Sequence, residues 1–164
     1  MIDGPSVAKA LAECGITHVI WIPDSTTGNW DPALSAHPDL KLIRVCREGE
    51  AFGVAAGLLL GGRKPIIIIQ CTGLFESGDS LRNFIHDLKL PLFCLIGLRN
   101  YHSYQQGRTS DTCPAFAESI LQAWRIPYVI LEQSAPAEAS AEALKSAYLQ
   151  ALNEKRAGVA FLAE

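Results

Sequence analysis

The sequence predicts an α/β protein: a three-layer, doubly wound, six-stranded parallel sheet with helices on both faces. Hydrophobic residues make up 49% of the 164 positions and charged residues only 19%, and several aliphatic runs are unbroken, which favours strands buried on both faces. Segments with helical and with strand-like periodicity also alternate along the chain. Each expected strand follows a segment long enough for a helix, which favours right-handed crossovers between parallel strands. No linker or repeat interrupts the pattern, so we expect one domain over residues 1–164.

The individual elements follow from periodicity and from their end signals. Apolar positions recur at helical spacing over residues 6–14, Gly15 is a suitable C-cap, and a β-rich run covers residues 17–22. The next expected elements are a helix at 30–36, a strand at 40–45, a helix at 48–60 closed by two glycines, and a strand at 66–70. The remaining ones are a helix at 81–88, a strand at 92–96, a long polar loop at 99–112, a helix at 114–124, a strand at 128–131, a helix at 136–154 and a strand at 159–162.

Charge and cysteine usage exclude several classes of function. The 14 basic and 17 acidic residues are scattered, so no field favours nucleic acid or an anionic membrane as a partner. The five cysteines form no CxxC pair and no zinc site, and we expect them to be small apolar core residues in a reducing compartment. Because no signal sequence or membrane-spanning run is recognisable, we expect a cytoplasmic protein.

Polar residues gather after the expected strands. In open parallel sheets ligands bind beyond the carboxyl ends of the strands. Here those ends are residues 23–28, 46–48, 71–78 and 97–108, which contain most of the unusual polar side chains. We therefore expect the functional site at this edge of the sheet.

Glu48 is the strongest single candidate among them, because it opens a helix directly after a buried strand. A carboxylate in the first turn also has a purely structural explanation, since it offsets the helix dipole by roughly 0.3–1 kcal/mol. The helix itself argues for more, because Ala51, Gly53, Ala55 and Gly57 leave it so lacking in bulk that a ligand or a partner helix is expected to approach its backbone closely.

The order of these residues resembles the pyrimidine-binding domain of thiamine-diphosphate-dependent decarboxylases. The pattern consists of Glu48, the small residues after it, then Gly62-Arg63-Lys64-Pro65 and a hydrophobic strand. Three further segments agree in order and spacing: Ile22-Pro23-Asp24-Ser25, Thr72-Gly73-Leu74 and Gly97-Leu98-Arg99. The resemblance runs from about Val7 to Leu98 and more loosely to Leu162. It is closest to the alpha subunit of sulfopyruvate decarboxylase and to the N-terminal domain of phosphonopyruvate decarboxylase.

The resemblance implies a chemical role for Glu48. In that family a buried glutamate holds a proton on ring nitrogen N1′ of thiamine diphosphate, and the cofactor's aminopyrimidine then removes the proton from thiazolium C2. Such assistance to proton transfer is worth ~10²–10⁴ in rate. The implied activity is that of a lyase that decarboxylates a 2-oxo acid. We expect Glu50, two residues on, to be a solvated or interface charge.

The other half of the cofactor site is missing from the sequence. Relatives bind the diphosphate through a metal ion held by Gly-Asp-Gly and a downstream asparagine pair, whereas this chain offers only Gly78-Asp79-Ser80, which we interpret as a loop leading to a helix N-cap. Neither GxGxxG nor GxxxxGK[ST] occurs. The resemblance therefore implies a second subunit that carries the diphosphate and Mg²⁺, and activity only in its presence.

The remaining site residues come from the strand-end loops. The resemblance assigns Pro23, Thr72, Gly73 and Leu74 to the cofactor, beside Glu48. The resemblance also implies that Ser25 lies near the reacting carbonyl, although Asp24-Ser25-Thr26-Thr27 is equally a good turn and N-cap sequence. Arg99 is expected to bind an anionic group of the substrate, or else to be an exposed loop residue. His102 lies in a loop that could close over the site, and a plain surface role is the alternative.

The sequence departs from the family pattern after the glycine loop. Phe75 and Glu76 stand where relatives usually have a glycine and an asparagine. A carboxylate near the substrate would disfavour a doubly anionic oxo acid. The sequence leaves open a carboligase or acyl-transfer enzyme on the same cofactor, a non-catalytic regulatory domain that kept the fold, and an unrelated flavodoxin-like binding domain.

Overall fold

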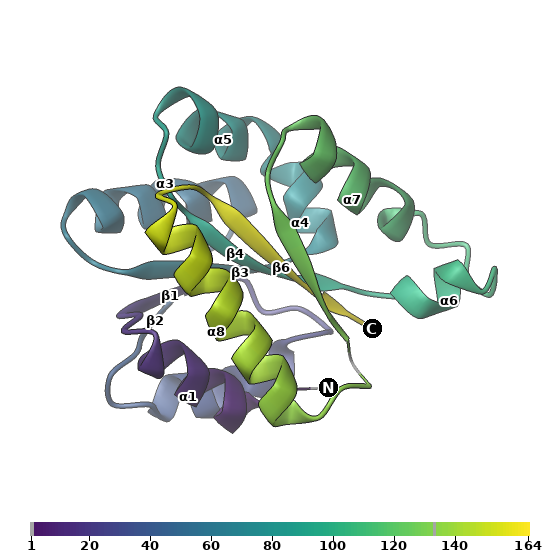
Figure 1. Cartoon of the computed structure of the whole chain (residues 1–164), viewed down its shortest axis with the longest axis horizontal. Coiled ribbons are helices and arrows are strands. Elements are labelled where there is room, and N and C mark those ends of the chain that lie inside the picture. Colours follow the sequence, from purple (N-terminus) through teal and green to yellow (C-terminus); the bar gives the residue numbers. More distant parts are fainter. Residues whose placement is uncertain (1, 133) are drawn as a thin grey trace.

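The protein was analysed as a computed structural model that describes residues 2–132 and 134–164. Within those residues, six parallel strands form one sheet in the order β2-β1-β3-β4-β6-β5 (Figure 1). The strands are β1 (His18–Trp21), β2 (Lys41–Arg44), β3 (Pro65–Gln70), β4 (Phe93–Leu98), β5 (Tyr128–Glu132) and β6 (Gly158–Ala163). The predicted doubly wound parallel sheet is confirmed.

Helices cover both faces of the sheet and complete three layers. One face carries η1 (Gly28–Trp30), α1 (Gly4–Glu13), α2 (Asp31–Ala36) and α8 (Ala137–Asn153), whose apolar side chains share one core cluster with the sheet. The other face carries α3 (Glu48–Leu60), α4 (Cys71–Glu76), α5 (Gly78–Arg82) and α7 (Cys113–Ala123), which pack into a second cluster. Figure 1 shows α1 and α8 on one side and α3, α5 and α7 on the other.

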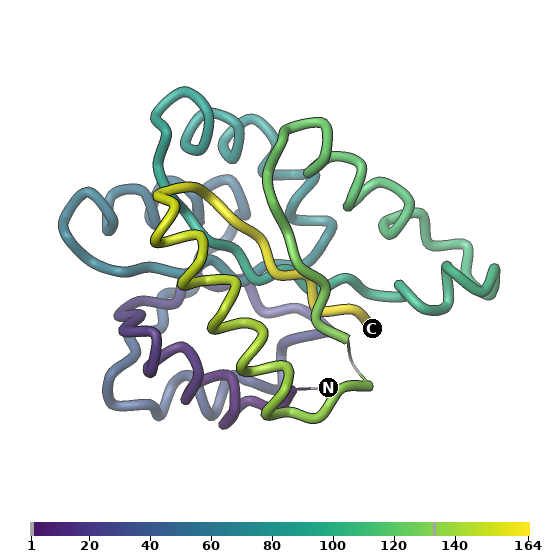
Figure 2. The backbone as a smooth tube through the Cα atoms, viewed as in Figure 1, coloured from purple at the N-terminus to yellow at the C-terminus, as the bar shows by residue number. Residues whose placement is uncertain are grey.

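The central strands explain the unbroken aliphatic runs in the sequence. Every residue of β4 and β6 is buried, and so are the first five of β3, because helices cover both of their faces. The edge strands β2 and β5 are only partly buried. Figure 2 traces the last strand, in yellow, through the middle of the fold, where it separates β4 from β5.

Two segments expected to be loops contain helices, so those predictions are wrong. Residues 71–78 form α4 and the start of α5, which runs into a π-helical turn, η2 (Asn83–Asp87). The Thr, Gly and Ser residues there suggested a turn, but Cys71 and Leu74 are fully buried in the core, and this burial outweighs local propensity. In the polar loop at 99–112, a short helix α6 (Tyr101–Gln105) begins after Asn100, whose φ of 57° is left-handed.

The chain reverses direction across the sheet between β1 and β3. From β1 it passes outward to the edge strand β2, and it then returns to β3 on the other side of β1. The carboxyl ends of these two strands therefore diverge at a topological switch point, which is where doubly wound sheets bind ligands. Among the described helices, none is long and apolar enough to cross a membrane.

Candidate functional site

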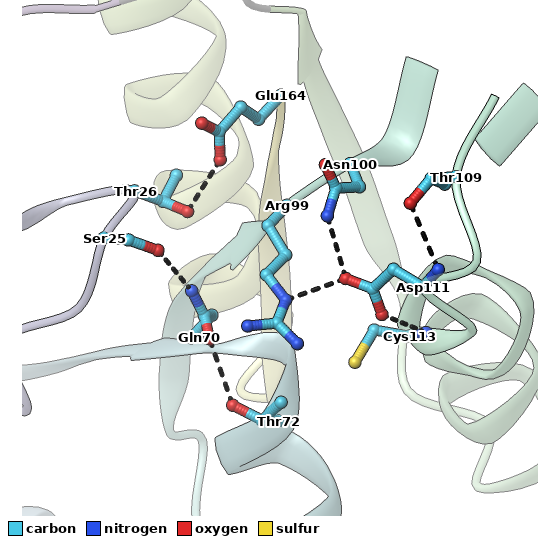
Figure 3. A network of polar contacts seen from close by, with 10 residues as sticks. All are labelled: Ser25, Thr26, Gln70, Thr72, Arg99, Asn100, Thr109, Asp111, Cys113 and Glu164. Atoms are coloured by element: carbon cyan, nitrogen blue, oxygen red, sulfur yellow. Dashed lines mark hydrogen bonds and ion pairs between the residues drawn. The ribbon is translucent and has the colours of Figure 1, made fainter. Parts of the chain in front are cut away.

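The loop after β1 is organised by Asp24 and leaves Ser25 outside its turn. Asp24 accepts hydrogen bonds from the backbone N–H groups of Thr26 and Thr27, at 2.7 and 2.9 Å, and from the Thr27 hydroxyl at 2.9 Å. This satisfies the turn without Ser25, whose side chain extends toward the end of β3 instead (Figure 3). The turn explanation therefore accounts for Asp24 but not for Ser25.

Gln70, the last residue of β3, connects Ser25 to Thr72. The Gln70 amide donates from Nε2 to Ser25 Oγ at 3.1 Å and accepts from Thr72 Oγ1 at 3.2 Å (Figure 3). Sequence analysis did not single out Gln70. The sequence did offer a signal for Gln70, because it is a polar residue directly after four consecutive isoleucines, at the carboxyl end of an expected strand.

Glu48 lies across the backbone of Gly73. A Cβ atom at Gly73 would come within 2.3 Å of Glu48 Cγ and 2.7 Å of its Oε1, so a side chain there would displace the glutamate. Glu48 is the first residue of α3 and is partly buried, and Gly73 is buried in α4. Among the residues that the structure describes, none donates a hydrogen bond to the Glu48 carboxylate. The helix at 48–60 begins and ends as predicted.

The Glu76 carboxylate bonds to the start of α3, on either side of Glu48. Its Oε1 accepts hydrogen bonds from Arg47 Nε and Nη2, at 3.0 and 2.5 Å, and its Oε2 accepts from the backbone N–H of Gly49 at 2.9 Å. These contacts, first those of Arg47 and then that of Gly49, lower the pKa of Glu76. The charge that was expected to face the substrate is thus paired within the chain.

Arg99 follows β4 and is held by Asp111. Its Nε donates to Asp111 Oδ2 at 2.8 Å, and Asn100 Nδ2 donates to the same oxygen at 3.0 Å (Figure 3). The hydrogen bond from Asn100 and that from the Cys113 N–H, with the nearby Arg99 charge, lower the pKa of Asp111 to about 2. In the part of the chain that the structure describes, both terminal nitrogens of Arg99 have no hydrogen-bond partner.

The loop after β1 and the segment after β4 meet. A Cβ atom at Gly97 would lie 3.0 Å from Thr26 Cβ, so the absence of a side chain lets the Ser25 loop cross the end of β4. The Thr26 hydroxyl also donates to Glu164, just beyond β6, at 2.9 Å. Because Gln70 pairs with Gly97 in the sheet, Thr72 and Arg99 leave it on neighbouring strands. Ser25, Thr72 and Arg99 therefore share one edge.

Three other predicted site residues lie less favourably. The His102 imidazole, on α6, lies 3.1 Å from the carboxylate of Glu132, the last residue of β5. Leu74 is fully buried in the core, so its backbone alone remains for a ligand. Pro23 is exposed at the end of β1.

The remaining sequence expectations have mixed outcomes. Four cysteines are buried as expected, and burial raises the pKa of the Cys71 thiol to about 12, but Cys46 is exposed, because it lies just beyond the edge strand β2. Asp79 lies inside the first turn of α5 and pairs with Arg82, where a loop was expected. Glu50 is exposed, and it reaches back to accept the Cys46 N–H at 3.2 Å. Among the described residues, no group of three or more His, Cys, Asp or Glu side chains could hold a metal ion.

Relatives with similar sequences are decarboxylases. Over 94 residues the chain is 31% identical to the sulfopyruvate decarboxylase subunit alpha of Methanococcus maripaludis, covering 57% of this chain and 56% of that protein. It is 29% identical over 130 residues to the sulfopyruvate decarboxylase of Methanosarcina acetivorans, covering 78% and 32%. It is 31% identical over 91 residues to the phosphonopyruvate decarboxylase of Streptomyces viridochromogenes, covering 56% and 23%. The matches thus span about half of the alpha subunit and less of the other two proteins.

A solved structure has the same fold as this chain, and a family model identifies its family. The crystal structure of benzoylformate decarboxylase from Polynucleobacter necessarius superposes on 99% of this chain and 30% of its own, with a TM-score of 0.71 and 21% identity. A sequence model of the thiamine pyrophosphate enzymes' N-terminal TPP-binding domain matches residues 4–119, well over half of the chain. The chain therefore belongs to the family of thiamine pyrophosphate enzyme N-terminal TPP-binding domains.

Proposed function

We propose that this chain is the alpha-type subunit of a thiamine-diphosphate-dependent lyase that decarboxylates a 2-oxo acid. The observation that carries the proposal is the position of Glu48, a partly buried acid at the open edge whose stem fits only because residue 73 is glycine. A role in the helix dipole alone would not need that fit. The names of the relatives, sulfopyruvate and phosphonopyruvate decarboxylases, support the reaction type.

The residues around Glu48 suit the aminopyrimidine ring. Glu48 has no hydrogen bond from the residues that the structure describes, so its carboxyl group is free to hold a proton on a ring nitrogen. An acid that shares a proton with a ring nitrogen away from water makes a strong hydrogen bond. Thiamine diphosphate, when bound, supplies the carbon nucleophile and the electron sink. Gly73 and Thr72 line the adjacent turn of α4, beside the path to Ser25.

The substrate would lie between Ser25 and Arg99. Because Ser25 Oγ accepts the Gln70 amide proton, its own proton remains available to a carbonyl or carboxylate oxygen. Asp111 engages only Nε of Arg99, so the terminal nitrogens are free to bind a carboxylate, sulfonate or phosphonate in a paired geometry. Since Glu76 is paired with Arg47, its charge does not argue against a second anionic group on the substrate.

A second subunit would complete the cofactor site. Among the described residues, no group of three or more His, Cys, Asp or Glu side chains could hold a metal ion. Three of the relatives are named as alpha subunits. We propose that the partner carries Mg²⁺ and the diphosphate. The cofactor would then lie between the two chains. A site built in this way needs both subunits, which favours a closed oligomer that contains both.

Calorimetry with thiamine diphosphate and magnesium tests the proposal. Binding is measured to this chain alone and to its mixture with the co-purifying partner, for wild type and Glu48→Gln. We expect tight binding only in the mixture, and a loss of 2-oxo acid turnover of ~10²–10⁴ in the variant. A Glu48→Gln complex as active as wild type would contradict the role of Glu48. If the mixture fails to bind the cofactor, the chain is a non-catalytic domain that kept the fold.

A further inference from the structure

The first turn of α3, which carries Glu48, has no cap of its own. The first N–H groups of any helix lack partners within the helix, and an N-cap side chain usually accepts one of them. Here the N-cap residue is Arg47, whose guanidinium has no acceptor and makes no capping bond. A partner for the Gly49 N–H therefore has to come from elsewhere in the fold.

Glu76, at the end of α4, supplies that partner. Its Oε2 accepts the Gly49 N–H at 2.9 Å across 27 residues of sequence, and Oε1 holds Arg47 at 2.5 Å. A carboxylate at a helix N-terminus is favourable because it faces the positive end of the dipole. One side chain thus binds the residues immediately before and after Glu48.

The middle of α4 contacts the Glu48 side chain. Glu48 lies against Gly73, where a Cβ would approach its Cγ to 2.3 Å. Glu76 and Gly73 are both on the short helix α4, so one element contacts the residues on either side of Glu48 and its side chain. Figure 1 shows α3 and α4 together on one face of the sheet.

We propose that Glu76 is a positioning residue for Glu48: it clamps the first turn of α3 to α4 and so sets the direction in which the Glu48 carboxyl group points. Arg47 orients the Glu76 carboxylate for this task. The inference rests on the proposed function of Glu48. It assigns a purpose to a residue that departs from the usual pattern of relatives, and it predicts effects on the helix start that exist without cofactor or partner.

Amide hydrogen exchange of the full chain alone tests the contact directly. In Glu76→Ala the Gly49 amide loses its acceptor, and we expect its exchange to accelerate about tenfold, as for the loss of a hydrogen bond to a charged group. Glu76→Gln keeps an acceptor oxygen and should retain most of the protection. Asp79→Ala is the matched control, because it removes another exposed carboxylate paired with an arginine, whose hydrogen bonds go to Arg82 and Asn83 and not to the Gly49 N–H. Equal exchange in Glu76→Ala and wild type would overturn the inference.

Assays of the complex with its partner test the consequence. We expect Glu76→Ala to lower kcat about tenfold and to weaken thiamine diphosphate binding by calorimetry, while KM for the oxo acid changes little, because the contact acts on Glu48 rather than on substrate. Glu76→Gln should recover most of both. If Glu48→Gln is inactive but Glu76→Ala matches wild type in kcat and cofactor affinity, the positioning role is refuted and the proposed function stands. If Glu48→Gln is fully active, the proposed function fails, whatever Gly49 exchange shows.

Discussion

At the scale of single residues, the candidate site depends on the orientation of the Ser25 and Thr72 hydroxyl groups. An amide has one donor end and one acceptor end, so Gln70 gives its two neighbours opposite roles. Ser25 accepts a hydrogen bond from Gln70, so its own hydroxyl proton remains free to be donated. Thr72 donates its hydroxyl proton to Gln70, so its oxygen lone pairs remain free to accept. The sequence identified both hydroxyls but not the amide between them.

Replacing Gln70 by Met should therefore affect substrate binding through Ser25. Methionine keeps the length of the side chain but cannot orient either hydroxyl. We expect KM for the oxo acid to rise about threefold to tenfold in the active complex, equivalent to one neutral hydrogen bond, with a smaller change in kcat.

A double-mutant cycle with Ser25→Ala separates this effect from general damage. If Gln70 acts through Ser25, the Gln70→Met change should add little once Ser25 is absent. Fully additive effects on KM would show that the two residues act independently.

At the scale of elements, α3 has a first turn fixed by contacts with α4, and it carries two glycines, Gly53 and Gly57, along its length. Among the residues that the structure describes, none closely approaches Gly53 or Gly57. A Cβ at Gly57 would meet nothing within 4 Å, and one at Gly53 would meet only Phe84, at 3.8 Å. Gly57 is exposed, so in the isolated chain nothing that the structure describes requires glycine at this position.

Gly57→Ala should consequently stabilise the isolated chain. Alanine is favoured over glycine within a helix by roughly 0.5–1 kcal/mol, and the space for its methyl group is open. Urea unfolding of the two proteins measures the difference. A destabilised variant would show that the surroundings of Gly57 are tighter than the structure indicates.

The segment between β4 and α7 depends on an ionised Asp111. Its pKa is lowered from 3.8 to about 2, chiefly by the hydrogen bond from Asn100. A lowered pKa in the folded state means that ionised Asp111 stabilises the fold above pH 4, and that this contribution disappears as the pH falls toward 2.

Asp111→Asn should therefore be destabilised by about 1–2 kcal/mol near neutral pH. The difference from wild type should shrink between pH 4 and pH 2. Urea unfolding at pH 7, 4 and 2.5 checks this, and a difference that stays constant across the range would argue against ionisation as its source.

At the scale of the whole molecule, the two core clusters lie on opposite faces of one sheet. Phe52 belongs to the cluster under α3, and Leu144 to the cluster under α8. Both are essentially inaccessible to water, at 0% and 1% exposure. The central strands contribute side chains to both clusters, so they couple the faces.

The prediction of one domain over residues 1–164 can be tested through this coupling. Phe52→Ala should cost about 3–5 kcal/mol and Leu144→Ala about 2–5 kcal/mol. In a single cooperative unit each change lowers the same unfolding transition, whether it is followed by far-UV circular dichroism or by tryptophan fluorescence. Two separable transitions, each sensitive to only one substitution, would divide the chain into two units.

The sequence by itself determined the parallel sheet, the helix at 48–60 and the edge at which polar residues gather. These features depend on periodicity and on the burial of neighbouring residues, which local sequence records. Glu48, Ser25 and Arg99 were identified because each follows a strand end and lies in a segment that resembles the family pattern. The helices α4 and α6 were missed, because local turn signals gave no measure of how deeply Cys71 and Leu74 in α4 and Tyr101 in α6 are buried.

Only the tertiary structure decided which side chains act together. The contacts of Glu76 with Gly49, of Gln70 with Ser25 and of Glu48 with Gly73 join residues brought together by chain reversals, and no periodicity encodes them. The same reversals pair Glu76 with Arg47, and they set His102 beside Glu132. A residue's chemical type can be read from sequence, whereas the partner that orients it depends on how distant segments pack.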